Sequence, residues 1–518
     1  MRDPESVTAK PAPMTHEASP PAAEPTARPL PCRGIDPEAQ RQLSFERLRR
    51  FLECDVLAYS PYYRRVFAEA GLDAASIRSI ADLARIPFTT KDEFREHGPD
   101  FVLQPRWHGQ PDETGTEPIS QACLDRYAAN VKRRVVDDVE PPQSDDELMY
   151  REFLLDWQPV LETRTGGTTG RSARAAYTYS DLVGPFARAA RFHHNIPSWT
   201  PTQRFMSLLP AGEHLGFYGN MLVPLLNGQP IRPMFGGRVT STENQVLAAA
   251  ASRVQVIQAT SSYLASWLDT ACAMMRAGQI EGLPSLQLVT AGGEPLTDGY
   301  AQSIRNSLAQ LGAGEARLIH AMSSTELKSG AFRECDHGTG LHVDPQHYFI
   351  ELLDPGTRAP VADGQPGMLV WSHIDWHGSV ILRYWSGDLV EGGVHRGPCP
   401  VCGLVVPRLM TPLRRLETDF LKIRGTRVDL TDLRSVLEGL FGRDGFQLEV
   451  RSDAGGIGRH RIVVYGLAAR VDGPDRVRDA VRGAVELGVD DVIFCDNDAM
   501  HERLYGAGGW KPRWMIHE

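Results

Sequence analysis

This 518-residue sequence has no long hydrophobic run, no excess of positive charge and only eight cysteines. No apolar run reaches the roughly 20 residues that a helix needs to cross a bilayer, and the first residues, MRDPESVTAK, lack the hydrophobic segment of a signal peptide. Acidic residues outnumber basic residues by 65 to 55, so the net charge of −10 argues against a broad surface for nucleic acid or anionic membranes. We expect a cytoplasmic protein with neither kind of partner.

The length and composition predict several domains with substantial cores. At roughly 150 residues per domain the chain would form about two to four units, and apolar residues make up 42% of it. Residues 1–36 are rich in Pro and Ala, which predicts a disordered lead-in. We expect a large N-terminal domain over 37–414, including an irregular, acidic surface excursion at 105–156, and a small C-terminal domain over 415–518.

Beyond Thr163, short apolar strands alternate with helices, which predicts an α/β fold with a largely parallel sheet. Strands that follow each other more closely around 348–372 indicate a β-rich subdomain, and residues 415–518 read as a small, mobile α+β domain. The candidate strands of the large domain are 204–209, 254–259, 286–291 and 317–321, and the candidate helices are 180–193 and 262–277.

The segment Thr163–Gly170 (TRTGGTTG), here called the glycine–threonine loop, packs four hydroxyls and three glycines into eight residues. Glycines allow backbone N–H groups to converge on an anion, and hydroxyls add donors. A flexible surface loop is the alternative. The P-loop spacing fails, because Gly166 to Gly170 is one residue short and Arg171 stands where lysine belongs. The candidate phosphate ligands are Thr165, Gly166, Gly167, Thr168, Thr169 and Gly170.

The stretch TRTGGTTGRSARAAYTYSDL resembles the signature loop of adenylate-forming enzymes, particularly the phenylacetate–CoA ligase branch, with Tyr177-Thr178 and Asp181 at matching places. Upstream, FERLRRFLECDVLAYSPYYRR and PFTTKDEFRE resemble the entry segment of that branch. The resemblance covers most of residues 40–518 and is poorest at 105–156. It implies ATP-dependent activation of a carboxylic acid to an acyl-adenylate.

The resemblance assigns nucleotide and magnesium ligands to two strand-ending turns. Gly293 and Glu294 would lie against the adenosine, although such a turn is often only structural. In SSTE, Thr325 would contact the α-phosphate, Glu326 would bind Mg²⁺ and Ser324 would assist, and the alternative is a helix N-cap. Met322 departs from the pattern, because the family usually has an aromatic residue that stacks on adenine.

Three further segments toward the C-terminus resemble motifs of the family. The stretch RYWSGDL makes Asp388 the ribose ligand, the alternative being an ordinary turn former. In the hinge segment RRLETDFLKIRG, Leu416 occupies the family's arginine position, Arg415 stands one residue early and Asp419 is retained. In GGWKPRW, Lys511 would be the mobile catalytic lysine that meets the carboxylate and the α-phosphate, rather than a tail lysine.

The knuckle Cys399-Pro-Val-Cys402 lies downstream of Cys335, His337 and His342. Three thiolates and one imidazole make a closed, tetrahedral structural zinc set, and the alternative is a pair of free thiols. Metal-bearing members of the branch have a Cys, a His in a Gly-x-His turn and a late Cys pair in the same order. The resemblance therefore favours His342, with His337 as the alternate ligand.

The segment LLPAGEHLGFYGNML lies where the resemblance places the acyl site. Its partly aromatic, partly polar side chains are consistent with an aryl acid bearing a polar substituent. For His214, the alternative is an ordinary buried histidine of the core. The candidate acid-binding residues are Glu213, His214, Phe217, Tyr218 and, from a later segment, Ser262.

Together these motifs and the resemblance predict an AMP-forming acid–thiol ligase that uses ATP and Mg²⁺ and contains structural zinc. Coenzyme A is the expected acceptor of the acyl group. Transfer to a carrier protein or an amine would need the same first half-reaction. A nucleotide-binding homologue with impaired catalysis is the rival that Met322 and Leu416 motivate. A homodimer is compatible with the sequence.

Overall fold

The computed structural model describes most of the chain, with short gaps. The described residues are 30–108, 110–112, 115–134, 144–164, 173–188, 200, 202–209, 212–234, 240–294, 296–329, 332–415, 420–423, 426–452, 460–485, 487–506 and 512–517. Within these ranges, no helix has both the length and the apolar character that a membrane crossing requires.

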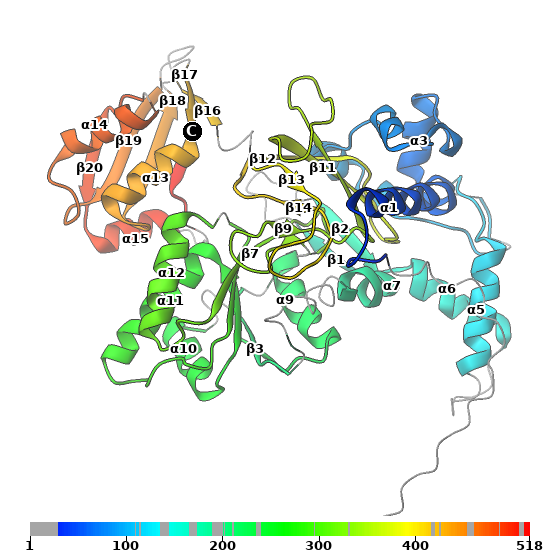
Figure 1. The fold of residues 1–518 in the computed structure, drawn as a ribbon, viewed down its shortest axis with the longest axis horizontal. Coiled ribbons are helices and arrows are strands. Elements are labelled where there is room, and N and C mark those ends of the chain that lie inside the picture. Colours follow the sequence, from blue (N-terminus) through cyan, green and yellow to red (C-terminus); the bar gives the residue numbers. More distant parts are fainter. Residues whose placement is uncertain are drawn as a thin grey trace, which may run out of the picture.

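A nine-stranded sheet forms the centre of the large domain (Figure 1), in the order β13-β14-β9-β8-β7-β6-β5-β3-β4. Neighbours are parallel from β4 to β7 and antiparallel from β7 to β13. These strands confirm the predicted α/β fold, and β5, β6 and β7 overlap the strands expected from the sequence. The strands are β3 Phe205–Ser207, β4 Ile231–Pro233, β5 Val256–Thr260, β6 Leu288–Gly292, β7 Arg317–Met322, β8 Phe332–Arg333, β9 Leu341–His342, β13 Val394–His395 and β14 Arg408–Leu409.

Helices connect the parallel strands and cover the sheet. They are α9 Leu215–Leu226, α10 Thr242–Ala251, α11 Ser261–Arg276 and α12 Asp298–Gln310. Their apolar faces enclose a core that includes Trp267, Leu268 and Ile304, all without solvent exposure. Strands β5 and β6 are covered on both faces, and nearly all of their residues are buried.

The helix predicted over 180–193 is broken. A short helix, α7 (Tyr179–Asp181), passes into a π-helical turn at Leu182–Phe186, where Gly184 has φ −93° and ψ −105°. The reason is Pro185, which cannot donate a helical hydrogen bond and disfavours helical backbone at the residue before it. The end of the predicted helix lies outside the described residues.

A second sheet and a hairpin complete the large domain. The antiparallel sheet has the order β10-β11-β12-β15 and corresponds to the expected β-rich subdomain. Strands β1 and β2 pair antiparallel, with Arg164 opposite Arg174, so they flank the glycine–threonine loop. The strands are β1 Pro159–Arg164, β2 Arg174–Thr178, β10 Tyr348–Leu353, β11 Gly367–His373, β12 Tyr384–Val390 and β15 Leu413–Arg415.

The N-terminal segment forms helices that pack on the second sheet. Asp36 caps α1 by accepting from the backbone N–H groups of Glu38 and Ala39. Phe45 and Phe51 of α1 are buried in the largest core cluster. The helices are α1 Pro37–Phe51, α2 Leu57–Tyr59, α3 Pro61–Glu69 and α4 Lys91–Glu96.

The prediction of an irregular surface excursion at 105–156 is wrong for much of this segment, because the segment contains α5 (Gln121–Arg134) and α6 (Asp145–Trp157). Leu124, Tyr127 and Val131 recur at helical spacing and are buried. Ser144 and Glu147 form a reciprocal capping box at the start of α6. The acidic composition of the segment concealed both signals.

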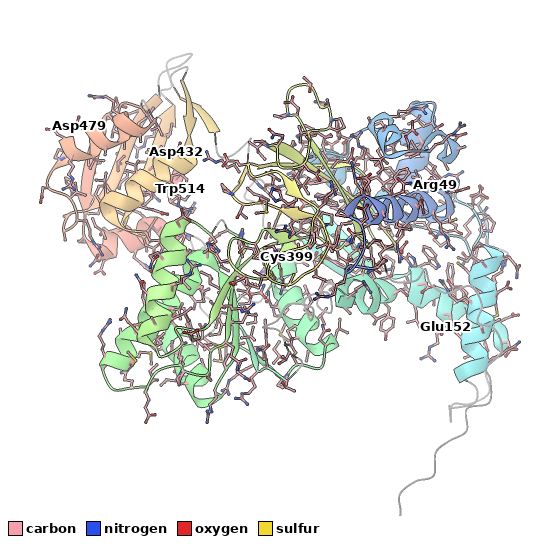
Figure 2. All side chains as sticks on the ribbon, in the orientation of Figure 1. Arg49, Glu152, Cys399, Asp432, Asp479 and Trp514 are labelled. Atoms are coloured by element: carbon pink, nitrogen blue, oxygen red, sulfur yellow. The ribbon has the colours of Figure 1, made fainter. Side chains whose placement is uncertain are left out.

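The C-terminal unit has a sheet in the order β20-β19-β18-β21 and a separate hairpin, β16–β17. Its Trp514 is labelled in Figure 2, and the guanidinium of Arg434 lies over both the Trp514 ring and the Tyr300 ring of α12. The predicted boundary at residue 415 stays a prediction. The elements are β16 Phe420–Ile423, β17 Thr426–Asp429, α13 Leu430–Phe441, β18 Phe446–Ser452, β19 His460–Leu467, α14 Pro474–Val485, β20 Asp491–Cys495, α15 Asn497–Tyr505 and β21 Met515–His517.

A buried ion pair ties three segments of the large domain together. Lys328 Nζ lies 2.7 Å from Asp181 Oδ2, and neither side chain is more than 1% exposed. The same carboxylate accepts from the backbone N–H groups of Thr178, His377 and Gly378. Burial would raise the pKa of Asp181, but the ammonium and these donors hold it below its ordinary value.

Lys328→Met should be strongly destabilising, because it leaves a buried carboxylate without its countercharge. We expect a loss of about 3–5 kcal/mol in the free energy of unfolding, measured by urea denaturation. The double variant Asp181→Asn/Lys328→Met should recover part of that loss. Equal stability of Lys328→Met and the unmodified protein would contradict the assigned role of the pair.

Candidate active site and a cysteine–histidine cluster

A pocket of about 580 Å³ opens at the carboxyl ends of the parallel strands. Strands β5, β6 and β7 end at Thr260, Gly292 and Met322, and all three residues line it. Ligands of open α/β sheets bind at this edge, because loops there leave a crevice that the strands position. Its volume lies in the range of small-molecule sites.

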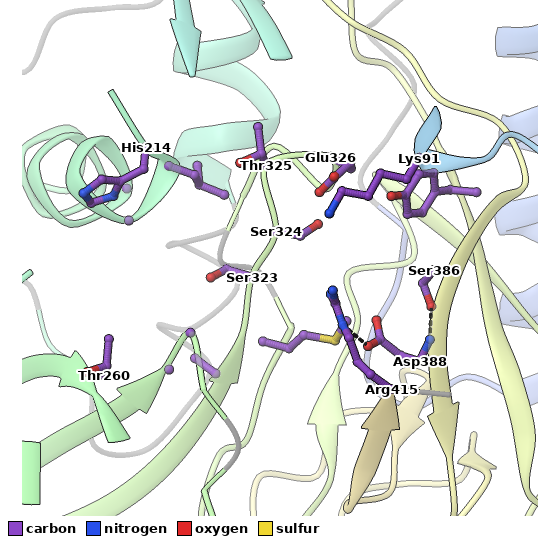
Figure 3. A pocket seen from close by; sticks show the side chains of 18 of the residues that line it. Lys91, His214, Thr260, Ser323, Ser324, Thr325, Glu326, Ser386, Asp388 and Arg415 are labelled. Carbon is purple, nitrogen blue, oxygen red and sulfur yellow. Dashed lines mark hydrogen bonds and ion pairs between the residues drawn. The ribbon is translucent and has the colours of Figure 1, made fainter. Parts of the chain in front are cut away.

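The turn after β7 supplies hydroxyls and a carboxylate to this pocket (Figure 3). Ser324, Thr325 and Glu326 all line it, and Thr325 and Glu326 are 7% and 5% exposed. The Ser324 hydroxyl accepts from the Leu327 backbone N–H at 3.1 Å, which fixes the turn. A carboxylate beside hydroxyls fits the oxygen ligands that Mg²⁺ prefers.

Asp388 and Arg415 face each other across paired strands β12 and β15. Arg415 Nε donates to Asp388 Oδ1 at 2.9 Å, and both residues line the pocket. The Asp388 carboxylate is the main cause of the raised pKa of Arg415. The sequence pattern left the arginine contact in doubt at Leu416, which lies outside the described residues, whereas Arg415 supplies a guanidinium to the pocket.

Lys91 also lines the pocket, and sequence reasoning did not assign it a role. Figure 3 shows its side chain extending toward Ser324 and Glu326. A capping box between Thr90 and Glu93 starts helix α4 at this point. The Thr89 N–H donates to the Arg383 carbonyl at 3.1 Å, which joins the start of α4 to the start of β12. The motif PFTTKDEFRE was the available signal.

Several aromatic side chains lie along the same wall. Trp371, Tyr384 and Trp385 line the pocket together with Met322. Burial, reinforced by the Glu326 carboxylate, raises the pKa of Tyr384 well above its ordinary value. The phenol therefore stays protonated and remains a hydrogen-bond donor beside that carboxylate.

At the opposite end, helix α9 and the end of β5 form the wall. His214 caps α9, and its Nδ1 accepts from the Phe217 backbone N–H at 3.2 Å. Of the five predicted acid-binding residues, only His214 belongs to the pocket lining. Glu213, Phe217, Tyr218 and Ser262 lie outside that lining.

Of the two residues predicted to lie against the adenosine, only one lines the pocket. Gly293 lines the pocket, whereas Glu294 points elsewhere and its Oε2 accepts from the Ser262 backbone N–H at 3.0 Å. Glu294 thus caps the start of α11. The assigned residues Thr165, Gly166, Gly167, Thr168, Thr169, Gly170 and Lys511 lie outside the described residues.

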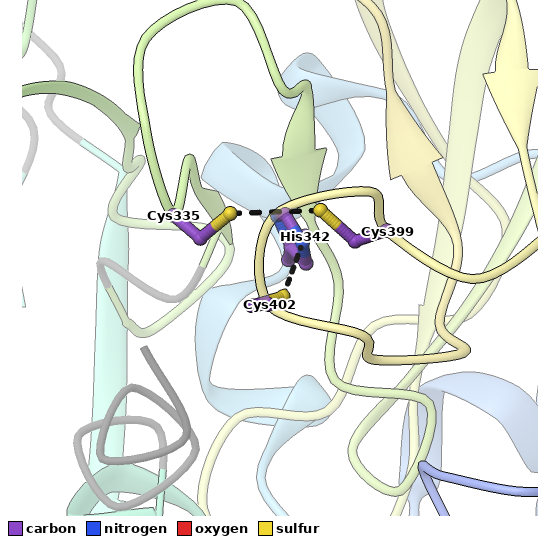
Figure 4. A group of neighbouring side chains, drawn as sticks. All are labelled: Cys335, His342, Cys399 and Cys402. Atoms are coloured by element: carbon purple, nitrogen blue, oxygen red, sulfur yellow. Dashed lines mark hydrogen bonds between the residues drawn. The ribbon is translucent and has the colours of Figure 1, made fainter. Parts of the chain in front are cut away.

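A separate buried cluster joins Cys335, His342, Cys399 and Cys402 (Figure 4), whose ligand atoms all lie within 4.8 Å of one another. Cys335 Sγ and Cys399 Sγ are 3.6 Å apart, and Cys402 Sγ lies 3.3 Å from His342 Nε2. Ligand atoms around a tetrahedral zinc ion are separated by about 3.3–3.8 Å, given Zn–S and Zn–N bonds of about 2.3 and 2.0 Å. The group can therefore hold a metal ion.

The geometry selects His342 over His337 for this cluster. His342 Nδ1 lies 3.0 Å from the Gly340 carbonyl, an acceptor that would hold the Nδ1 proton and direct Nε2 toward the sulfurs. His337 instead lies beside Glu334, with Nδ1 3.4 Å from Oε2. Cys335 follows β8 and His342 ends β9, so the cluster lies at the antiparallel side of the large sheet.

Residues 98–385 match the model of a protein family described as AMP-binding enzyme. The chain belongs to this family. It is 27% identical to the phenylacetate–coenzyme A ligase of Thermus thermophilus over 413 residues, which cover 77% of this chain and 75% of that protein. It is 23% identical to the phenylacetate–coenzyme A ligase of Escherichia coli K12 over 379 residues, covering 71% and 69%. These relatives confirm the resemblance to the phenylacetate–CoA ligase branch.

Solved structures support the fold. A 2-hydroxyisobutyryl-CoA ligase in the postadenylation state superposes with a TM-score of 0.67 at 16% identity, covering 94% of this chain and 91% of that chain. The same ligase in the thioesterification state gives a TM-score of 0.57 at 17% identity, with the same coverage. At these identities the likeness concerns the fold alone.

Proposed function

We propose that this member of the AMP-binding enzyme family is an AMP-forming acid–thiol ligase. A carboxylate oxygen attacks the α-phosphorus of ATP, the bond to the pyrophosphate oxygen breaks, and an acyl-adenylate forms. The thiol of coenzyme A then attacks the acyl carbon, AMP leaves and the thiol proton passes to solvent. The observation that carries the proposal is the convergence of Glu326, Asp388, Arg415 and Lys91 in one pocket at the strand ends.

The nucleotide roles follow from the positions of these groups. Asp388 accepts from the ribose hydroxyls, Thr325 donates to the α-phosphate, and Glu326 holds Mg²⁺, which neutralises phosphate charge. Gly293 and Ser324 line the same wall. The glycine–threonine loop and Lys511 complete the phosphate site, supported by the family resemblance, and Glu294 acts through its contact with the start of α11.

Lys91 adds a cation to the phosphate end of the pocket. It extends toward Ser324 and Glu326, where ATP phosphates coordinated through Mg²⁺ would lie (Figure 3). A point cation delivered by α4 would stabilise the charge that develops on the transferred phosphate.

The acid and the acceptor form the finer part of the proposal. An aryl acid with a polar substituent suits a pocket that combines aromatic, aliphatic and amide side chains. The names of the curated relatives favour coenzyme A over a carrier protein or an amine. A cytoplasmic homodimer is compatible with the chain. Arg415 and Lys91 argue against a catalytically impaired homologue, because both keep charged groups at the pocket.

ATP–pyrophosphate exchange across a panel of aryl acids tests the first half-reaction. We expect exchange with at least one acid, a loss of about 100-fold in Lys511→Ala and a smaller loss in Lys91→Met. Lys132→Ala, at an exposed lysine of α5, is the matched control and should exchange normally. No exchange with any acid, under conditions in which ATP binding is measured directly, would sink the proposal.

The cysteine–histidine cluster is proposed to hold structural zinc. Three thiolates and one imidazole leave no open coordination position for catalysis. The ligands come from the loop after β8, from β9 and from the loop between β13 and β14, so the ion would join the outer strands of the nine-stranded sheet. Arg333 on β8 lines the pocket two residues before Cys335, so a bound ion would lie close to the pocket wall.

Zinc removal should destabilise the large domain. The purified chain should contain about one zinc per molecule by elemental analysis, and Cys399→Ser/Cys402→Ser should contain none and lose at least about 3 kcal/mol in the free energy of unfolding. Cys54→Ser, at an exposed cysteine outside the cluster, should keep both metal and stability. Full stability of the double variant without metal would refute a structural ion.

A further inference from the structure

The pocket has two chemically different ends. Figure 3 shows Glu326, Asp388 and Arg415 on one side, and His214 and Thr260 on the other. The second side, here called the α9 end, is lined by α9 and by the end of β5. Its lining residues are Leu209, His214, Leu215, Gly216, Gly219, Asn220, Val223, Gln258, Ala259 and Thr260.

The α9 end has room for a ligand beside its amide side chains. Gly219 lies on the pocket face of α9, and a Cβ atom built there would meet no atom within 4 Å. Leu215 and Val223, one helical turn on either side, supply apolar contacts. This end therefore accepts a flat or branched apolar body and presents polar groups around it.

Asn220 presents an acceptor to that space. Its Nδ2 donates to the Gly216 carbonyl at 2.7 Å, which fixes the orientation of the amide because a carbonyl oxygen only accepts. The remaining amide oxygen of Asn220 accepts no hydrogen bond from the described part of the chain. Asn220 is 4% exposed and lines the pocket, so a ligand is the natural donor to this oxygen.

Gln258 presents both a donor and an acceptor. It lies on β5 between β3 and β6, is 9% exposed and lines the pocket. Its side-chain amide makes no hydrogen bond with any residue that the structure describes. A buried amide without partners costs free energy unless a ligand or water satisfies it. Gln258 therefore points to a ligand that both donates and accepts.

The charge at this end indicates that the ligand group is neutral. Arg164 lines the pocket near His214, and its Nε lies 3.3 Å from both Glu162 Oε1 and Glu213 Oε2. Its charge is thus balanced by carboxylates of the chain. Asn220 and Gln258 carry no charge, so neither a second carboxylate nor an ammonium is favoured there. A hydroxyl both donates and accepts without charge.

We infer that Gln258 and Asn220 select a carboxylic acid that carries a hydroxyl group away from its carboxylate. The hydroxyl donates to the Asn220 amide oxygen and accepts from the Gln258 amide nitrogen, while the carboxylate faces the charged end. The inference rests on the proposed function and names the substrate class of the same site. An acid without the hydroxyl leaves two buried amides unsatisfied, which is the basis of rejection.

The test compares matched acids in ATP–pyrophosphate exchange. The pairs are benzoate with each monohydroxybenzoate, and phenylacetate with each monohydroxyphenylacetate. We expect the best hydroxy acid of a pair to exceed its parent by about 10- to 100-fold in kcat/KM. Gln258→Leu should lower that ratio to about 3-fold or less, through loss on the hydroxy acid and not on the parent.

Two further variants separate recognition from folding. Thr290→Val changes the residue of β6 that pairs with Gln258. The buried Thr290 hydroxyl has no hydrogen-bond partner among the described residues and does not line the pocket, so the ratio should be unchanged. Asn220→Ala provides an independent loss of recognition if Gln258→Leu does not fold, as judged by its melting temperature. It should lower the same ratio.

The outcomes distinguish this inference from the function on which it rests. Equal exchange of hydroxy acids and parents by the unmodified protein overturns the inference and leaves the function standing. An unchanged ratio of hydroxy acid to parent acid in a folded Gln258→Leu or Asn220→Ala variant also overturns the inference and leaves the function standing. The absence of exchange with every acid overturns the proposed function instead.

Discussion

The Asp181–Lys328 ion pair is the constraint on which the site depends. Lys328 follows Glu326 by two residues, and Asp181 lies just after β2, so the pair joins the turn that carries Glu326 to the segment after β2. The same carboxylate binds the backbone N–H groups of His377 and Gly378, shortly before β12 and its Asp388. Gly378 packs against the Ala176 carbonyl so closely that a Cβ would overlap it. A buried charge makes this arrangement costly to break.

The charged end and the α9 end of the pocket are built from different kinds of secondary structure. Charged groups come from loops, from α4 and from the antiparallel strands, whereas the α9 end is built from a helix and the buried strand β5. Rigid, buried elements suit discrimination between acids, because they hold the Gln258 and Asn220 side chains at fixed positions in the pocket lining. The cysteine–histidine cluster lies at the antiparallel side of the sheet, and its Cys335 is two residues from Arg333 on the pocket wall.

Local signals in the sequence predicted four of the five parallel strands, β3, β5, β6 and β7, and marked the Cys399–Cys402 pair, because periodicity and ligand type are properties of neighbouring residues. The choice of His342 came from the family resemblance. Lys91 was missed because its position depends on a contact between Thr89 and β12, almost 300 residues away. The role of Arg415 was left in doubt because the family pattern counts positions, whereas strand pairing decides which side chain faces Asp388. The capping box of α6 and the helical spacing of apolar residues in α5 could have predicted these helices, but the acidic composition of the segment was given more weight.

The central claim is that the acid oxygen attacks the α-phosphorus of ATP. The most direct measurement uses an acid labelled with ¹⁸O in its carboxylate, incubated with ATP, Mg²⁺ and coenzyme A, followed by mass spectrometry of the nucleotide and phosphate products. The account predicts AMP that carries one labelled oxygen, together with unlabelled pyrophosphate. Unlabelled AMP, or ADP with labelled phosphate, would contradict it.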